Sequence, residues 1–205
     1  MKKLTKILSM ALVLMLSLTV MIGCGGPKLT PDQSAKIVLD ILLKGDNSQI
    51  AEIGMSQDEF DQVRKAMDDQ MEALITQLGR ASISEDNKKV LQESFFESIK
   101  KVEYTTKLVS EEKNTATVEL SIKPVDMTAL ATQLMDEAKN YATANPTATQ
   151  KEASEFVIQK FAELLKSAPL KSEETKIIIN LSSDGKVWMP NKADFTKIGN
   201  SLFAQ

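Results

Sequence analysis

One thiol is the most reactive side chain of this sequence, and its neighbours are small. Cys24 is the only cysteine among 205 residues, and Gly23 and Gly25 flank it. A thiolate is a strong nucleophile that an enzyme can alkylate, and glycines allow close approach to the backbone. A single thiol excludes an intramolecular disulfide and a cysteine-rich metal site. We therefore expect Cys24 to be a site of covalent modification.

The residues before Cys24 indicate export. Three lysines, at positions 2, 3 and 6, precede an almost wholly apolar run from residue 7 to residue 22. A basic segment, an apolar segment and a small residue before a cleavage site are typical of a secretory signal. The run falls short of the roughly 20 residues that span a bilayer. An uncleaved membrane helix and a plain secreted protein are the alternatives.

The stretch Val20–Gly25 resembles the bacterial lipobox, although Met21 and Ile22 are bulkier than the usual residues there. The resemblance implies cleavage between Gly23 and Cys24 and a diacylglyceryl group on the Cys24 sulfur. We therefore expect a signal peptide over 1–23, a tether over 24–29 and a folded domain over 30–205. The six tether residues reach roughly 20 Å at full stretch, which keeps the domain near the bilayer.

Candidates for catalysis are weak. The chain has no histidine, so Ser-His-Asp and Cys-His sets cannot form. Two Ser-x-x-Lys spacings occur, Ser98–Lys101 and Ser183–Lys186. We expect the first on a solvated helix face and the second in a turn. The prediction is that no residue is catalytic; a small hydrolase using carboxylates or a Ser-Lys pair is the alternative.

Acidic pairs do not form a recognisable metal site. They occur at 68–69, 111–112 and 173–174. Adjacent helical residues point about 100° apart, so Asp68 and Asp69 cannot converge on one atom. Neither a calcium-loop pattern nor a glycine-rich phosphate loop is present. We expect no metal and no cofactor, and scattered oxygen ligands remain the open alternative.

Four apolar residues are candidates for a contact or pocket. Met67 and Met71 fall on a helical apolar stripe, where methionine is either core filler or part of an adaptable binding surface. We expect Trp188 to pack under the closing helix. Phe96, beside Phe95 at the edge of its stripe, is the best candidate for a partly exposed contact.

Charge excludes one class of partner. The formal net charge is −3, and loss of residues 1–23 removes three lysines, leaving 22 basic and 28 acidic side chains. This sign argues against nucleic-acid binding, which needs lysine and arginine to neutralise phosphates. About 180 residues without repeats suit one domain.

Sequence periodicity predicts an α+β domain. Capping boxes at Thr30–Gln33 and Ser56–Glu59 and a cap at Ser84 open three N-terminal helices. Alternating apolar residues predict hairpins over 102–122 and 175–189, and a helical pair over 126–168 lies between them. A last helix starts at Asn191 or Asp194. We expect these helices, including an inserted αα-hairpin, to pack on a roughly four-stranded antiparallel sheet.

The Tyr104–Asp126 segment, "YTTKLVSEEKNTATVELSIKPVD", and Trp188 resemble an uncharacterised group of lipoproteins from Gram-positive bacteria. The resemblance implies a domain of unknown function with a nuclear-transport-factor-two-like or cystatin-like α+β fold. It supplies no catalytic residues. Fold likeness alone assigns no activity.

These observations lead to one functional expectation. We expect a non-enzymatic lipoprotein, anchored in the bilayer through acylated Cys24 on the extracytoplasmic face of the cell membrane. Its partner would be an unknown protein or a small apolar ligand, and not a nucleic acid. A ligand-capture protein for a transporter is the third hypothesis, after the enzyme.

Overall fold

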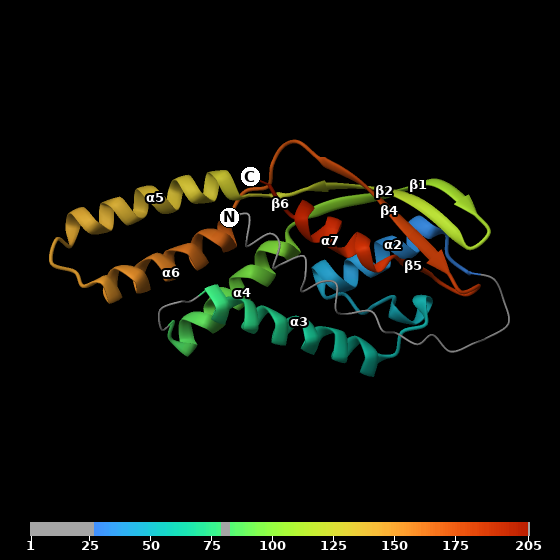
Figure 1. Cartoon of the computed structure of the whole chain (residues 1–205), viewed down its shortest axis with the longest axis horizontal. Helices are drawn as coiled ribbons and strands as arrows, with labels where there is room; N and C mark the ends of the chain where they lie inside the picture. Colours follow the sequence, from blue (N-terminus) through green and yellow to red (C-terminus); the bar gives the residue numbers. More distant parts are fainter. Residues whose placement is uncertain (1–26, 79–82, 205) are drawn as a thin grey trace.

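A computed structural model describes residues 27–78 and 83–204 of the chain (Figure 1). The predicted signal peptide, Gly23 and Cys24 lie outside the described residues. None of the helices within these two ranges is long and apolar enough to cross a bilayer.

The helices begin where the capping residues predict. The Thr30 N–H donates to Gln33 Oε1 (3.0 Å), and the Ser56 N–H donates to Glu59 Oε2 (2.7 Å). The first helix continues as one wider turn, η1, and Gly45 ends that turn with a φ of 68°. The helices are α2 (Pro31–Leu39), η1 (Asp40–Lys44), η2 (Ile50–Ile53), α3 (Gln57–Leu78), α4 (Glu85–Lys100), α5 (Met127–Ala144), α6 (Gln150–Ser167) and α7 (Lys192–Ser201).

The strands form one antiparallel sheet of order β1-β2-β4-β5, which confirms the predicted fold class. Its strands are β1 (Glu103–Glu112), β2 (Thr115–Lys123), β4 (Thr175–Ser183) and β5 (Trp188–Pro190). Tyr104 pairs with Ile122 and Leu120 with Ile177, so the predicted alternation places apolar side chains on one face. Both predicted hairpins thus join one sheet.

A second pair of strands was not expected. β3 (Val125–Asp126) runs parallel to β6 (Phe203–Ala204) and joins the middle of the chain to its last described residues. Two-residue strands carry no periodic signal, so the sequence pattern could not predict them.

Helices cover one face of the sheet in layers (Figure 1). α2 packs against β1, β2 and β5, α7 packs against β4, and α3 and α4 lie beyond α2. The buried core extends from Ala35 to Phe203 and includes Leu120, Trp188 and Phe195. Residues from near both ends of the described chain therefore share one core.

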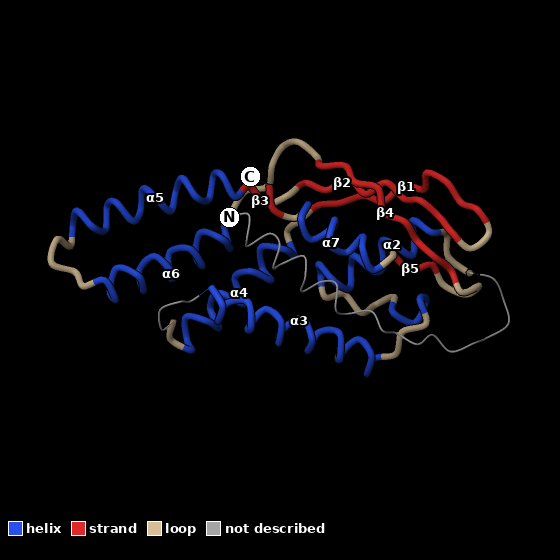
Figure 2. The backbone as a smooth tube through the Cα atoms, viewed as in Figure 1, coloured by secondary structure: helices blue, strands red, loops and turns tan. Residues whose placement is uncertain are grey.

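The inserted αα-hairpin projects from this body (Figure 2). We call α5, α6 and their connection the arm. α6 packs on both α5 and α4. At its base, the Asp126 N–H donates to the Pro169 C=O (2.8 Å) and the Lys171 N–H to the Pro124 C=O (2.8 Å). An ion pair between Lys171 and Asp126 (3.0 Å) lies beside them. The two ends of the arm are therefore held together.

Candidate functional site

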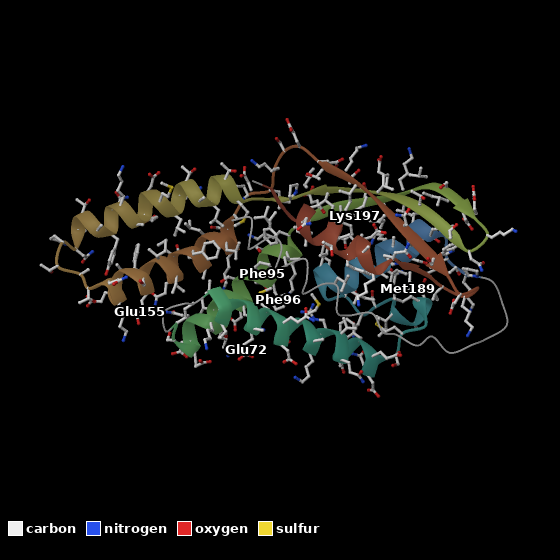
Figure 3. All side chains as sticks on the ribbon, viewed as in Figure 1. Glu72, Phe95, Phe96, Glu155, Met189 and Lys197 are labelled. Atoms are coloured by element: carbon white, nitrogen blue, oxygen red, sulfur yellow. The ribbon has the colours of Figure 1, made fainter. Side chains whose placement is uncertain are left out.

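The four predicted contact residues lie in two different places. Met67 and Met71, on α3, are 8% and 5% exposed, and Trp188, on β5, is 2% exposed. Phe96, on α4, is partly buried and packs against the core where α4 faces α3 (Figure 3). Met67 and Phe96 thus belong to one helix contact, whereas Trp188 lies in the sheet. Of the four, Phe96 retains an accessible side chain.

Arg64 joins Met67 to Phe96. Its guanidinium carbon lies 5.2 Å from the centre of the Phe96 ring, and Nη1 lies 3.7 Å from the Met67 sulfur. Gly45 faces the same guanidinium, since a Cβ there would lie 3.5 Å from the Arg64 carbon. Cation–π contact orients such an arginine. We call Arg64, Met67 and Phe96 the α3–α4 patch; it is an apolar contact with one fixed positive charge.

Lys44 connects η1 to the end of α4 and to the start of β1. Its ammonium donates to the backbone C=O groups of Lys100, the last residue of α4, and of Val102, just beyond the helix. It also lies 5.4 Å from the Tyr104 ring centre. Burial lowers the pKa of Lys44, although nearby Asp40 opposes the shift. A lysine suits these partners because it neutralises the negative end of a helix dipole.

Tyr104 and Asp40 complete the connection. The Tyr104 hydroxyl donates to Asp40 Oδ1, and Lys36 lies 2.6 Å from Asp40 Oδ2. Burial, reinforced by the hydrogen bond to Asp40, raises the pKa of Tyr104 above its ordinary range. Within this contact the neutral phenol acts as a donor. The arrangement holds η1 against β1.

A buried carboxylate closes an open part of the sheet edge. β2 pairs with β4 along one edge, but on the other edge β5 pairs only with Leu181–Ser183, so that edge of β4 has no described strand beside it before Leu181. There the Asn180 N–H donates to Asp194 Oδ2 (2.9 Å), and the Lys197 ammonium donates to the Ile178 C=O (3.3 Å). Lys197 also forms an ion pair with Asp194 Oδ1. Side chains of α7 thus bond to β4 where a neighbouring strand would otherwise do so. Lys197 is labelled in Figure 3.

The Ser-x-x-Lys spacings lie elsewhere. Ser98 is 1% exposed, which corrects the predicted solvated position, and its hydroxyl donates to the Phe95 C=O (2.7 Å). Ser183 accepts from the Gly185 N–H (3.0 Å) within the predicted turn. α4 packs on both α3 and α6, so a serine outside its apolar stripe is buried against a second helix.

The carboxylate pairs do not converge. Asp69 pairs with Lys65 (2.9 Å), and Asp68 accepts from Gln92 Nε2 (3.4 Å). Within residues 27–78 and 83–204, no three His, Cys, Asp or Glu side chains gather as a metal site would require.

Sequence reasoning missed Arg64, Lys44 and Asp194. Arg64 lies one turn before Met67 on the same helical face, and that spacing is the signal that could have identified it. Asp194 was considered only as a helix cap; the cap position is Asn191, and the Asp194 side chain bonds to β4 instead.

A comparison with solved structures found a protein of similar fold. A crystal structure of a "putative lipoprotein (ycdA)" from Bacillus subtilis superposes with a TM-score of 0.69 at 21% sequence identity. The match covers 85% of this chain and 56% of that chain, so the chain spans little more than half of that protein. No curated protein matches the sequence significantly. Residues 30–203 match the family described as "Domain of unknown function (DUF5105)", and the chain belongs to that family.

Proposed function

We propose that this protein is a lipid-anchored, non-enzymatic binding module on the outer face of a bacterial cytoplasmic membrane. The observation that carries the proposal is the sole cysteine, Cys24, placed between two glycines after an apolar run and seven residues before Pro31, where the first described helix begins. The structural similarity to the Bacillus subtilis protein described as a putative lipoprotein supports the lipoprotein assignment. The proposal includes a cleaved signal peptide, palmitate and diacylglycerol on Cys24, and a Gram-positive source.

A binding role is supported by what the polar side chains do. Ser98 bonds to a helix carbonyl, Asp194 bonds to a strand edge, and Lys44 bonds to the end of a helix. Each interaction stabilises the fold, and each uses a group that would otherwise be a candidate for chemistry. We also propose that this fold is related to the nuclear-transport-factor-two-like or cystatin-like α+β folds.

The contact for a partner is the α3–α4 patch. Phe96 offers an aromatic ring, and Arg64 offers a cation whose position is fixed by that ring. Aromatic residues and arginine dominate the energetics of many protein interfaces. An unknown protein or a small apolar ligand is the partner we propose, at the short distance from the bilayer that the tether allows.

Metabolic labelling tests the anchor. In the full chain, labelled fatty acid should appear on the wild type and be absent from Cys24→Ser, which should accumulate as a longer precursor. Because a serine hydroxyl is far less nucleophilic than a thiolate, this variant removes the reaction and little else. Label on Cys24→Ser, or an intact Met1 start on the wild type, contradicts the proposal.

A further inference from the structure

The tether joins the body at one end of the sheet. The Thr106 hydroxyl donates to the Asp32 C=O (3.0 Å), and the Tyr104 hydroxyl donates to Asp40. Because Tyr104 pairs with Ile122, close to the end of β2 that leads into the arm, α2 and η1 run toward the arm. The residues before α2 therefore lie on the side of the β1–β2 turn, and Figure 1 shows the described chain starting beside that turn.

Two turns of the sheet lie together at this end. The Ser183 N–H, where β4 ends, donates to the Asn114 C=O in the β1–β2 turn (2.9 Å). We call the entry of the tether and these two turns the anchor end, which comprises residues 27–29, 111–115 and 183–187. It is the end of the long axis opposite the arm (Figure 1).

The anchor end presents a polar surface with balanced charge. It contains three lysines and three acidic residues, and Lys28 and Lys113 are exposed. Its larger apolar side chains face inward, since Leu29 packs against the core and Val187 belongs to it. Such a surface can meet lipid headgroups without charge repulsion, and it offers no exposed large apolar side chain for the hydrocarbon.

The tether is too short for this end to leave the membrane, if Cys24 is anchored as we propose. Leu29 packs against the core, so the chain is attached to the body five residues after Cys24. Five residues extend to at most about 18 Å. An acylated Cys24 lies at the headgroup level, and the anchor end then lies within that distance of it.

Two other faces of the body fit a bilayer less well. α3 has two basic and six acidic residues, so an anionic lipid surface repels it. On the open face of the sheet, Lys123 pairs with Glu103 (2.6 Å) and Lys176 with Glu119 (3.1 Å). These lysines already have carboxylate partners within the sheet. Lying on either face therefore gains less from lipid phosphates than standing on the anchor end does.

The arm extends in the opposite direction. β2 has nine residues, which span about 30 Å from the turn to the base of the arm. α5 has eighteen residues and adds about 27 Å along the same axis (Figure 1). The connection between α5 and α6 therefore lies on the order of 50 Å from the anchor end.

We infer that the anchored protein stands on the lipid headgroup layer by its anchor end and directs the arm away from the membrane. The inference rests on the proposed lipidation of Cys24, and it adds which surface faces the lipid and which element reaches outward.

Fluorescence quenching in vesicles tests this orientation. Processed full-length protein is reconstituted into phosphatidylcholine and phosphatidylglycerol vesicles that carry a nitroxide on some headgroups. Because acylation blocks the Cys24 thiol, one added cysteine takes the fluorophore. Four exposed positions sample the anchor end, the open sheet face, α3 and the tip of the arm: Asn114→Cys, Thr105→Cys, Glu72→Cys (labelled in Figure 3) and Thr147→Cys.

The order of quenching decides the result. Quenching at Asn114→Cys should exceed that at Thr105→Cys and Glu72→Cys at least threefold, and Thr147→Cys should show none. Equal quenching at Thr105→Cys or Glu72→Cys means that the body lies on that face, and it overturns the inference. Quenching at Thr147→Cys overturns it as well. Flotation with the vesicles is measured on the same samples: protein that does not float refutes the proposed anchor and this inference together, whereas floating protein with another order refutes the inference alone.

A longer tether provides the matched control. Twelve glycine and serine residues inserted after Pro27 add about 40 Å at full stretch, so they should reduce quenching at Asn114→Cys at least threefold while flotation is retained. The same insertion after Thr147, in the connection of the arm, should leave quenching at Asn114→Cys unchanged. Quenching that does not respond to the longer tether contradicts the role of the short tether in holding this end at the lipid.

Discussion

Removal of the single Asp194 carboxylate should substantially lower the free energy of unfolding. Asp194 is 2% exposed and accepts the Asn180 N–H at the open edge of β4. Asp194→Ala leaves that donor without its partner, which costs about 1–3 kcal/mol for a part-buried group, with charged acceptors at the upper end. We expect the free energy of unfolding to fall by about 2–3 kcal/mol.

Urea denaturation and thermal unfolding measure this loss. In a domain of this size each kcal/mol shifts the Tm by about 2–4 °C, so Asp194→Ala should melt about 4–12 °C lower. Asp194→Asn retains an oxygen acceptor and should lose about 1 kcal/mol.

Lys197→Ala is the matched control for the ion pair. The Lys197 side chain is 49% exposed, so its charge is solvated and its loss should cost less than about 1 kcal/mol. The reasoning fails if Asp194→Ala changes stability by less than about 0.5 kcal/mol. It fails equally if Lys197→Ala costs as much as Asp194→Ala, because the ion pair rather than the edge hydrogen bond would then dominate.

Two further predictions concern the glycine at position 45 and the loss of stability at acidic pH. Gly45→Ala should destabilise by about 1–2 kcal/mol in urea titrations, because its φ of 68° disfavours a Cβ. Gly54→Ala, with a φ of 72° and open space around it, should cost less. The Ser56 and Thr149 N–H groups lower the pKa values of Glu59 and Glu152 from the ordinary 4.5. A carboxyl group whose pKa is lower in the folded than in the unfolded state stabilises the fold at pH values above its unfolded pKa. This stabilisation is lost as the pH falls through its folded pKa. The urea midpoint should therefore drop as pH falls below about 4.5, less steeply in Glu59→Gln than in the wild type; equal slopes would contradict this assignment.

Local sequence patterns predicted the helices and strands, but they could not predict contacts between residues far apart in the sequence. Capping residues and apolar periods predicted where α3 begins and that Val118, Leu120 and Ile122 of β2 share one buried face, because both are set within a few residues. Ser98 was misplaced because its burial depends on α6, which follows it by some fifty positions. Arg64 and Lys44 gain their roles from Phe96 and from the end of α4, which only the folded chain brings near.

The parallel pairing of Val125 with Phe203 imposes an order on biogenesis. A ribosome releases Val125 well before Phe203, so the base of the arm lacks this pairing partner until the intervening residues have been translated. Closing so long a loop is entropically costly, and it must precede the gain from these contacts. Nascent chains stalled shortly before Phe203 should therefore hold a formed sheet and an arm without a fixed direction.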